Sequence, residues 1–108
     1  MKDWLDRAEK AIEYLASTDR QIAEYRVKWE RDKRQTKRTW SAIYLRVTGT
    51  VDERKAQAET HEEHQSAVAA EMTSLLEYEK LRNERDSARD LVDFWRSYNR
   101  AVNEGNIT

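Results

Sequence analysis

The chain has 108 residues, which is the length of one domain. Hydrophobic and charged residues each make up 38% of it, whereas ordinary globular domains are about 45–50% apolar and about 25% charged. This composition argues against a thick, round core, and the net charge of −1 together with four Trp and five Tyr argues against disorder. Helix-forming residues dominate, which favours long amphipathic helices that bury a narrow seam.

The sequence also excludes several chemical classes. It has no cysteine, so it forms no disulfide and no cysteine-ligated metal site. Its apolar runs are only a few residues long, far short of the roughly 20 that span a membrane, and the first ten residues hold no apolar signal-peptide core. We therefore expect a soluble cytoplasmic protein with no membrane partner.

The first predicted helix covers residues 3–47. Its apolar residues recur at intervals of seven, which is typical of a coiled-coil seam. The main row is Leu15, Ile22, Trp29, Thr36 and Ile43, and the adjoining row is Leu5, Ile12, Trp40 and Val47. The adjoining row is interrupted by Asp19, Arg26 and Lys33, so the middle of the seam is polar. Whether this helix breaks at residues 17–19, where Thr18 and Gln21 can form a capping box, stays open at this point.

A turn is predicted at residues 48–50. Gly49 can adopt a positive φ angle, and Thr50 and Glu53 have the spacing of a capping box that starts a new helix. So short a connection favours two helices that lie antiparallel to each other.

The second helix is predicted over residues 51–103, followed by a frayed tail at 104–108. In a hairpin about the turn, residues whose numbers add up to about 98 face each other, which places Trp29 opposite Ala69. The sequence thus predicts one all-α domain, residues 1–108, folded as a long, coiled-coil-like antiparallel helical hairpin. Two helices alone leave much of the seam exposed, so we expect assembly into a helical homo-oligomer.

Aromatic residues are expected to pack in the seam or in oligomer contacts. Phe94 and Trp95 are adjacent and point about 100° apart on a helix, so they cannot both face one partner helix. The residues assigned to packing are Trp4, Trp29, Trp40, Phe94, Trp95 and Tyr98.

Charge is distributed unevenly along the chain. Residues 26–46 hold eight basic and two acidic residues, whereas residues 47–108 hold eight basic and 13 acidic residues. Cationic side chains neutralise phosphates, and aromatic rings stack on unpaired bases. The predicted nucleic-acid-binding residues are Arg31, Lys33, Arg34, Lys37, Arg38 and Arg46, with Tyr44 as a stacking group.

A purely structural interpretation competes with this one. The basic residues can pair across the hairpin with Glu59, Glu62 and Glu63, and Trp29 and Trp40 then belong to the core. Such surface pairs are weak and too few for six surplus charges, although the overall pI of about 6.2 weighs against nucleic acid.

The HEEH motif places His61 and His64 three residues apart on a predicted helix. It lacks the HExxH spacing of zinc proteases, so a solvated polar face is the favoured interpretation and we expect no metal. The sequence also has no glycine-rich phosphate loop and no set of catalytic side chains on a rigid scaffold. We expect no enzyme activity and no cofactor.

Three stretches resemble small helical-hairpin proteins encoded in tailed-phage genomes near recombination genes. They are KRTWSAIYLRVTGTVDERKAQAE, LLEYEKLRNERDSAR and WRSYNRAVNEGNI. In architecture the chain is similar to the UvsY-type recombination mediators of T-even phages, which carry a Lys/Arg and Tyr cluster before the turn, in the region of Arg38, Tyr44 and Arg46 here.

The resemblance implies a phage DNA-recombination accessory protein in the host cytoplasm. Such a protein forms oligomers, binds single-stranded DNA and helps to load a recombinase onto strands covered by single-strand-binding protein. The alternatives are a coiled-coil scaffold or adaptor that binds protein partners and, more weakly, an inhibitor whose acidic helix mimics nucleic acid.

Overall fold

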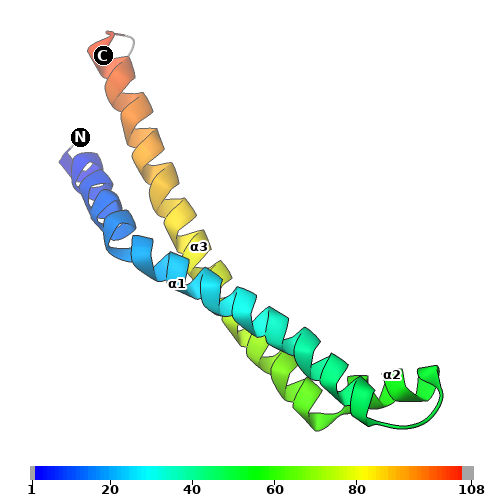
Figure 1. Ribbon diagram of the computed structural model, residues 1–108. Coiled ribbons are helices and arrows are strands. Elements are labelled where there is room, and N and C mark those ends of the chain that lie inside the picture. The colour runs from blue at the N-terminus through cyan, green and yellow to red at the C-terminus, as the bar shows by residue number, and fades with distance from the viewer. Residues whose placement is uncertain (1, 106–108) are drawn as a thin grey trace. The chain divides into compact units, whose positions relative to one another are not determined.

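The computed structural model describes residues 2–105, which form three α-helices in the order α1, α2, α3 (Figure 1). α1 spans Lys2–Arg46, α2 spans Val51–Thr60 and α3 spans Glu62–Asn103. Residues 2–105 contain no β-strand, so the predicted all-α helical hairpin is confirmed as the fold class. Of the tail predicted at 104–108, the last three residues lie outside the described part of the chain.

α1 is helical throughout residues 17–19, the segment that the sequence left open. The hydroxyls of Ser17 and Thr18 both donate to the carbonyl oxygen of Tyr14, at 3.0 and 2.7 Å. Ser and Thr inside a helix often donate their hydroxyl to a carbonyl of the preceding turn, and such hydrogen bonds often bend the helix slightly. The hydroxyl of Thr18 is therefore used within the helix rather than as a cap.

The turn after α1 uses the residues that the sequence indicated. Gly49 has a φ of +127°, and Thr50 adopts an extended backbone before α2 begins. The hydroxyl of Thr50 accepts a hydrogen bond from the amide of Glu53 at 3.2 Å, which satisfies one of the free amides at the helix start.

The predicted single helix over residues 51–103 is wrong at His61. This residue has an extended backbone, with φ −65° and ψ 138°, and separates α2 from α3. Side chains satisfy the freed backbone groups: His61 Nδ1 accepts from the amide of Glu63 at 3.1 Å, and Gln65 Nε2 donates to the carbonyl of Glu59 at 2.6 Å. α3 also starts with two acidic residues, which are favourable at the positive end of a helix.

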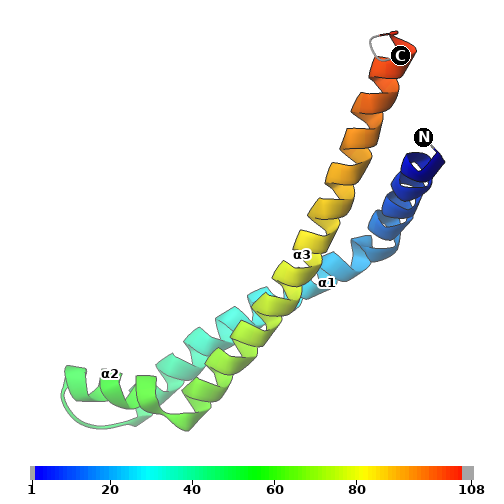
Figure 2. The same ribbon diagram turned by 180° about the vertical axis from the view of Figure 1, so that it is seen from behind.

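The helices pack as two compact units. The terminal unit consists of Met1–Ile22 with Lys80–Thr108, and the turn unit is Ala23–Glu79. Within each unit a segment of α1 lies beside an antiparallel segment of α3, and the turn unit also contains α2 (Figures 1 and 2).

The terminal unit has the predicted pairing of residues. Trp4 packs against Phe94 with ring centroids 5.0 Å apart, and the hydroxyl of Tyr14 donates to a carboxylate oxygen of Glu84 at 2.8 Å. Trp95 and Tyr98 are half-buried, whereas Phe94 is 52% exposed. The adjacent Phe94 and Trp95 therefore differ in burial.

The turn unit departs from the predicted pairing. Trp29 stacks on Tyr78 with ring centroids 5.7 Å apart, nine residues further along the chain than its predicted partner Ala69. In this unit the break at His61 sets off α2, whose ten residues precede the start of α3. The start of α3 then meets the end of α1, where Arg46 contacts Glu63 at 3.1 Å.

The core is thin in both units. Three of the six buried apolar residues within 2–105 are alanines, and Ile43 is the one large side chain among them that is completely enclosed. They are Ala8, Ala11, Leu81 and Val92 in the terminal unit and Ile43 and Ala58 in the turn unit. Met72 and Leu76 of α3 are 56% and 70% exposed.

Candidate nucleic-acid interface

Four basic residues form an open cationic face on α1. Arg31, Arg34 and Arg38 recur at intervals of three and four, which places them on one side of the helix, and Lys37 lies next to them. All four are exposed, and no acidic side chain of the described chain lies within ion-pair distance of any of them. We call this set the open cationic face. It leaves four positive charges available to a ligand.

The side of α1 opposite this face packs on α3. Trp29 and Thr36 lie on that packed side, where Trp29 stacks on Tyr78 and the hydroxyl of Thr36 donates to the carbonyl of Ala67 at 3.2 Å. Asp32 also points to α3 and accepts from the hydroxyl of Ser74. These contacts fix the rotation of α1, so the open cationic face is directed away from α3.

Lys33, also predicted to bind nucleic acid, borders the packed side. Its ammonium lies 5.3 Å from the ring centroid of Trp29, in a cation–π contact, and its side chain remains exposed. Lys28, five residues earlier, forms an ion pair with Glu77 at 3.5 Å. Lys33 therefore contributes charge at the edge of the open cationic face.

Arg46 is separate from the open cationic face. Its guanidinium contacts a carboxylate oxygen of Glu63 at 3.1 Å and Nε2 of His61 at 3.2 Å. Both partners of the ion pair are about half exposed, so the pair contributes little to the free energy of folding. Of the cross-hairpin pairs that the structural interpretation expected with Glu59, Glu62 and Glu63, this is the one that forms in residues 2–105.

Tyr44 is packed rather than open. Its ring stacks on Trp40 at 5.3 Å with 9° between the planes, and the guanidinium of Arg54 lies 4.2 Å from its centroid. Arg54 also donates to the carbonyl oxygen of Tyr44 at 2.8 and 3.2 Å, which satisfies a free carbonyl at the end of α1. The ring stabilises the joint between α1 and α2, so base stacking by Tyr44 would require this packing to open.

Two exposed apolar residues flank the open cationic face, and the sequence reasoning missed them. Val27 is 62% exposed and Leu45 is 76% exposed. Val27 lies four residues before Arg31 and Leu45 lies seven after Arg38, so helical spacing puts both on the same side. This spacing is the sequence feature by which the two residues could have been assigned to the open cationic face.

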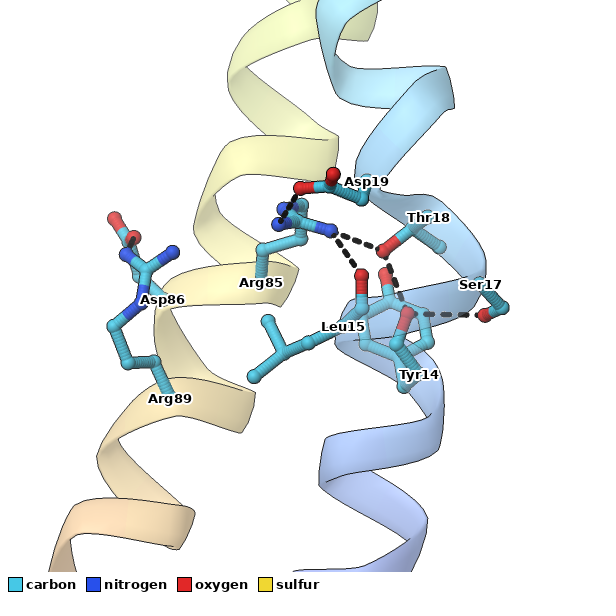
Figure 3. Close-up of polar contacts among 8 residues, drawn as sticks. All are labelled: Tyr14, Leu15, Ser17, Thr18, Asp19, Arg85, Asp86 and Arg89. Carbon is cyan, nitrogen blue, oxygen red and sulfur yellow. Dashed lines mark hydrogen bonds and ion pairs between the residues drawn. The ribbon is translucent and has the colours of Figure 1, made fainter.

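A buried arginine lies in the terminal unit and takes no part in the open cationic face (Figure 3). Arg85 is 8% exposed and donates to the carbonyl of Leu15 at 2.8 Å and to the hydroxyl of Thr18 at 2.6 Å. It also contacts Asp19 at 3.3 Å, whereas Arg89, on the same helix, pairs with an acid outside this cluster. The charge of Arg85 is used to join α1 to α3.

The HEEH segment is engaged in structural contacts. Both ring nitrogens of His61 are used, one with Arg46 and one with the amide of Glu63, and Nδ1 of His64 is buried without a hydrogen-bond partner. In the part of the chain that the structure describes, no three His, Asp or Glu side chains converge on one point. Between residues 2 and 105, no helix has both the length and the apolar character needed to cross a membrane.

The chain matches no protein-family model, no curated protein and no solved structure.

Proposed function

We propose that the protein binds single-stranded DNA without catalysing a reaction and acts as a recombination accessory protein, similar to a phage recombination mediator. The observation that supports DNA binding is the open cationic face, four exposed and unpaired cations on the outward side of one helix. The recombination role follows from the resemblance to UvsY-type proteins. It makes a recombinase or a single-strand-binding protein the expected protein partner.

The chemistry of this face suits a phosphate backbone. Arg31, Arg34 and Arg38 carry planar guanidinium groups, which bind phosphate oxygens through two parallel hydrogen bonds. Each neutralised phosphate releases counterions, so binding should be sequence-independent and should weaken as salt is added. Val27 and Leu45 add apolar contacts that exposed bases of a single strand can reach.

Charge reversal tests the assigned residues. In the triple variant Arg34→Glu, Lys37→Glu, Arg38→Glu, we expect affinity for a labelled single-stranded oligonucleotide to fall at least about tenfold at low salt, because three phosphate contacts are lost. The measurement is an electrophoretic mobility shift with oligonucleotides of different sequence, all of which should be affected alike. Circular dichroism should show unchanged helix content, since all three side chains are exposed.

A matched control separates the face from net charge. The triple variant Lys10→Glu, Lys55→Glu, Lys80→Glu changes the net charge by the same amount at exposed positions outside the open cationic face. It should keep most of the affinity. Equal losses in the two variants would show that the assigned face is wrong.

A protein-binding scaffold is the second candidate, and the exposure of Met72 and Leu76 on α3 favours it. In that case the open cationic face meets an acidic protein. Wild-type protein would then fail to shift the oligonucleotide even at low salt, and the two triple variants would be indistinguishable in this assay.

A further inference from the structure

The outward side of α3 in the turn unit is uncharged over three helical turns. Between residues 66 and 76 the exposed positions are all apolar or small and polar, and the single charged residue, Glu71, is half-buried. The exposed residues are Ser66, Ala69, Ala70, Met72, Thr73 and Leu76. We call this set the uncharged face. In a chain with 38% charged residues, such a surface is suited to contact with another apolar surface rather than with water.

We infer that the uncharged face is the contact between two copies of this chain, with the two α3 helices antiparallel across a two-fold axis near Met72 and Thr73. This interface is independent of the proposed DNA binding, since it uses none of the residues of the open cationic face.

The order of small and large residues along the face supports a second copy as the occupant. The first half holds Ala69 and Ala70, and the second half holds the larger Met72 and Leu76. In an antiparallel pair the small half of one copy lies against the large half of the other, so that Leu76 fits over Ala69 of its partner. A surface that complements itself in this way is what two-fold symmetric dimers require.

Charge and burial support the same partner. The uncharged face carries no charge that an acidic or basic partner would satisfy, but a second uncharged face leaves no charge unpaired. The turn unit itself buries only Ile43 and Ala58 fully among its apolar residues in the described chain. A second copy would cover Met72 and Leu76 and would supply the burial that the hairpin lacks.

The uncharged face and the open cationic face lie on the outward sides of α3 and α1, whose opposite sides pack together through Trp29 and Tyr78. Pairing through α3 therefore leaves the cationic face of both copies accessible.

The first test compares two lysine substitutions at matched leucines. Leu76→Lys lies in the uncharged face and Leu45→Lys lies on α1, and the two leucines are 70% and 76% exposed in the hairpin. By light scattering after size exclusion, wild type should have at least twice its chain mass of 12.9 kDa. Leu76→Lys should lower the mass by half, and Leu45→Lys should leave it unchanged. A monomeric wild type, or a Leu76→Lys variant of unchanged mass, would overturn the proposal.

The second test uses the absence of cysteine from the chain. Under mild oxidation, Met72→Cys should link to itself between copies because it lies near the axis. Ala69→Cys should not link to itself but should link to Leu76→Cys when the two variants are mixed. Efficient self-linking of Ala69→Cys would contradict the antiparallel arrangement. Because cysteine is small and uncharged, these variants should fold even where lysine disrupts the assembly.

Discussion

At the scale of single residues, Gly49 has the most restrictive backbone. Its φ is +127°, which side-chain-bearing residues rarely adopt, and an added Cβ would lie 2.7 Å from Oε2 and 3.2 Å from Cβ of Glu53. Glu53 is the residue whose amide Thr50 caps. The end of α1 and the start of α2 therefore depend on one position without a side chain.

Gly49→Ala should consequently destabilise the protein by about 1–3 kcal/mol, through backbone strain and the displacement of Glu53. Urea unfolding followed by circular dichroism measures the loss. Gly105→Ala is the control, since Gly105 also has a positive φ, of +75°, but no atom lies within 4 Å of its added Cβ. It lies beyond the end of α3, so its loss should be smaller, and equal losses would contradict this account of the turn.

Tyr14 makes the free energy of unfolding depend on pH in the alkaline range. Burial raises the pKa of its phenol above the usual 10.0, the hydrogen bond and negative charge of Glu84 raise this pKa further, and the charge of Arg85 partly opposes them. The folded protein thus favours the neutral phenol. The stabilisation is fully present below pH 10 and is lost as the pH rises through the raised pKa of the folded state.

We therefore expect the free energy of unfolding to fall more steeply above pH 10 in wild type than in Tyr14→Phe, which has no phenol to ionise. Urea titrations between about pH 8 and pH 11 measure the two slopes. Parallel slopes would show that Tyr14 is not held in its neutral form.

At the scale of helices, Arg85 joins α3 to α1 in the terminal unit through buried hydrogen bonds. Its guanidinium satisfies the carbonyl of Leu15 and the hydroxyl of Thr18 on the facing helix. Asp19, its ion-pair partner, has an 81% exposed side chain and can be solvated by water when the arginine is removed. The cost of removing Arg85 should therefore come from the buried hydrogen bonds and the lost volume.

Arg85→Ala should destabilise the protein by about 2 kcal/mol, because buried acceptors lose their donor and a cavity remains. Arg89→Ala should cost less than about 0.5 kcal/mol, since Arg89 forms an exposed pair with Asp86. Chemical unfolding of both variants gives the comparison. If both variants lose the same small amount of unfolding free energy, the buried hydrogen bonds of Arg85 do not stabilise the contact between α1 and α3.

The helices also show what the sequence could and could not predict. Heptad spacing and the capping box around Thr50 predict α1 and the turn, because these features act over a few residues. The break at His61 was missed because HEEH has ordinary helical composition, and the break depends on side-chain bonds such as that from Gln65 to Glu59. The pairing of Trp29 with Tyr78 in the turn unit was missed as well.

In the candidate site, too, features set by neighbouring residues could be predicted and features set by distant contacts could not. Arg31, Arg34 and Arg38 could be predicted as exposed because they lie off the apolar seam. The surroundings of Tyr44 and Arg46 could not, because their partners come from α2 and α3. Arg54 covers the ring of Tyr44 and Glu63 pairs with Arg46, and both contacts depend on where the chain reverses.

At the scale of the whole molecule, the net charge of −1 conceals a local cationic surface. Thirteen of the 21 acidic residues follow residue 47, and within residues 2–105 none of them pairs with the four cations of the open cationic face. A polyanion bound at this face would release the counterions of about four phosphates. The slope of log affinity against log salt concentration therefore gives the number of cations that contact phosphates.

The most direct measurement is the fluorescence anisotropy of a labelled single-stranded oligonucleotide titrated with wild-type protein between about 50 and 200 mM salt. The logarithm of affinity should fall linearly with the logarithm of salt concentration, with a slope of about −3 for four phosphate contacts at about 0.7 each. Absence of binding at the lowest salt, or an affinity that salt does not change, would contradict DNA binding by the open cationic face.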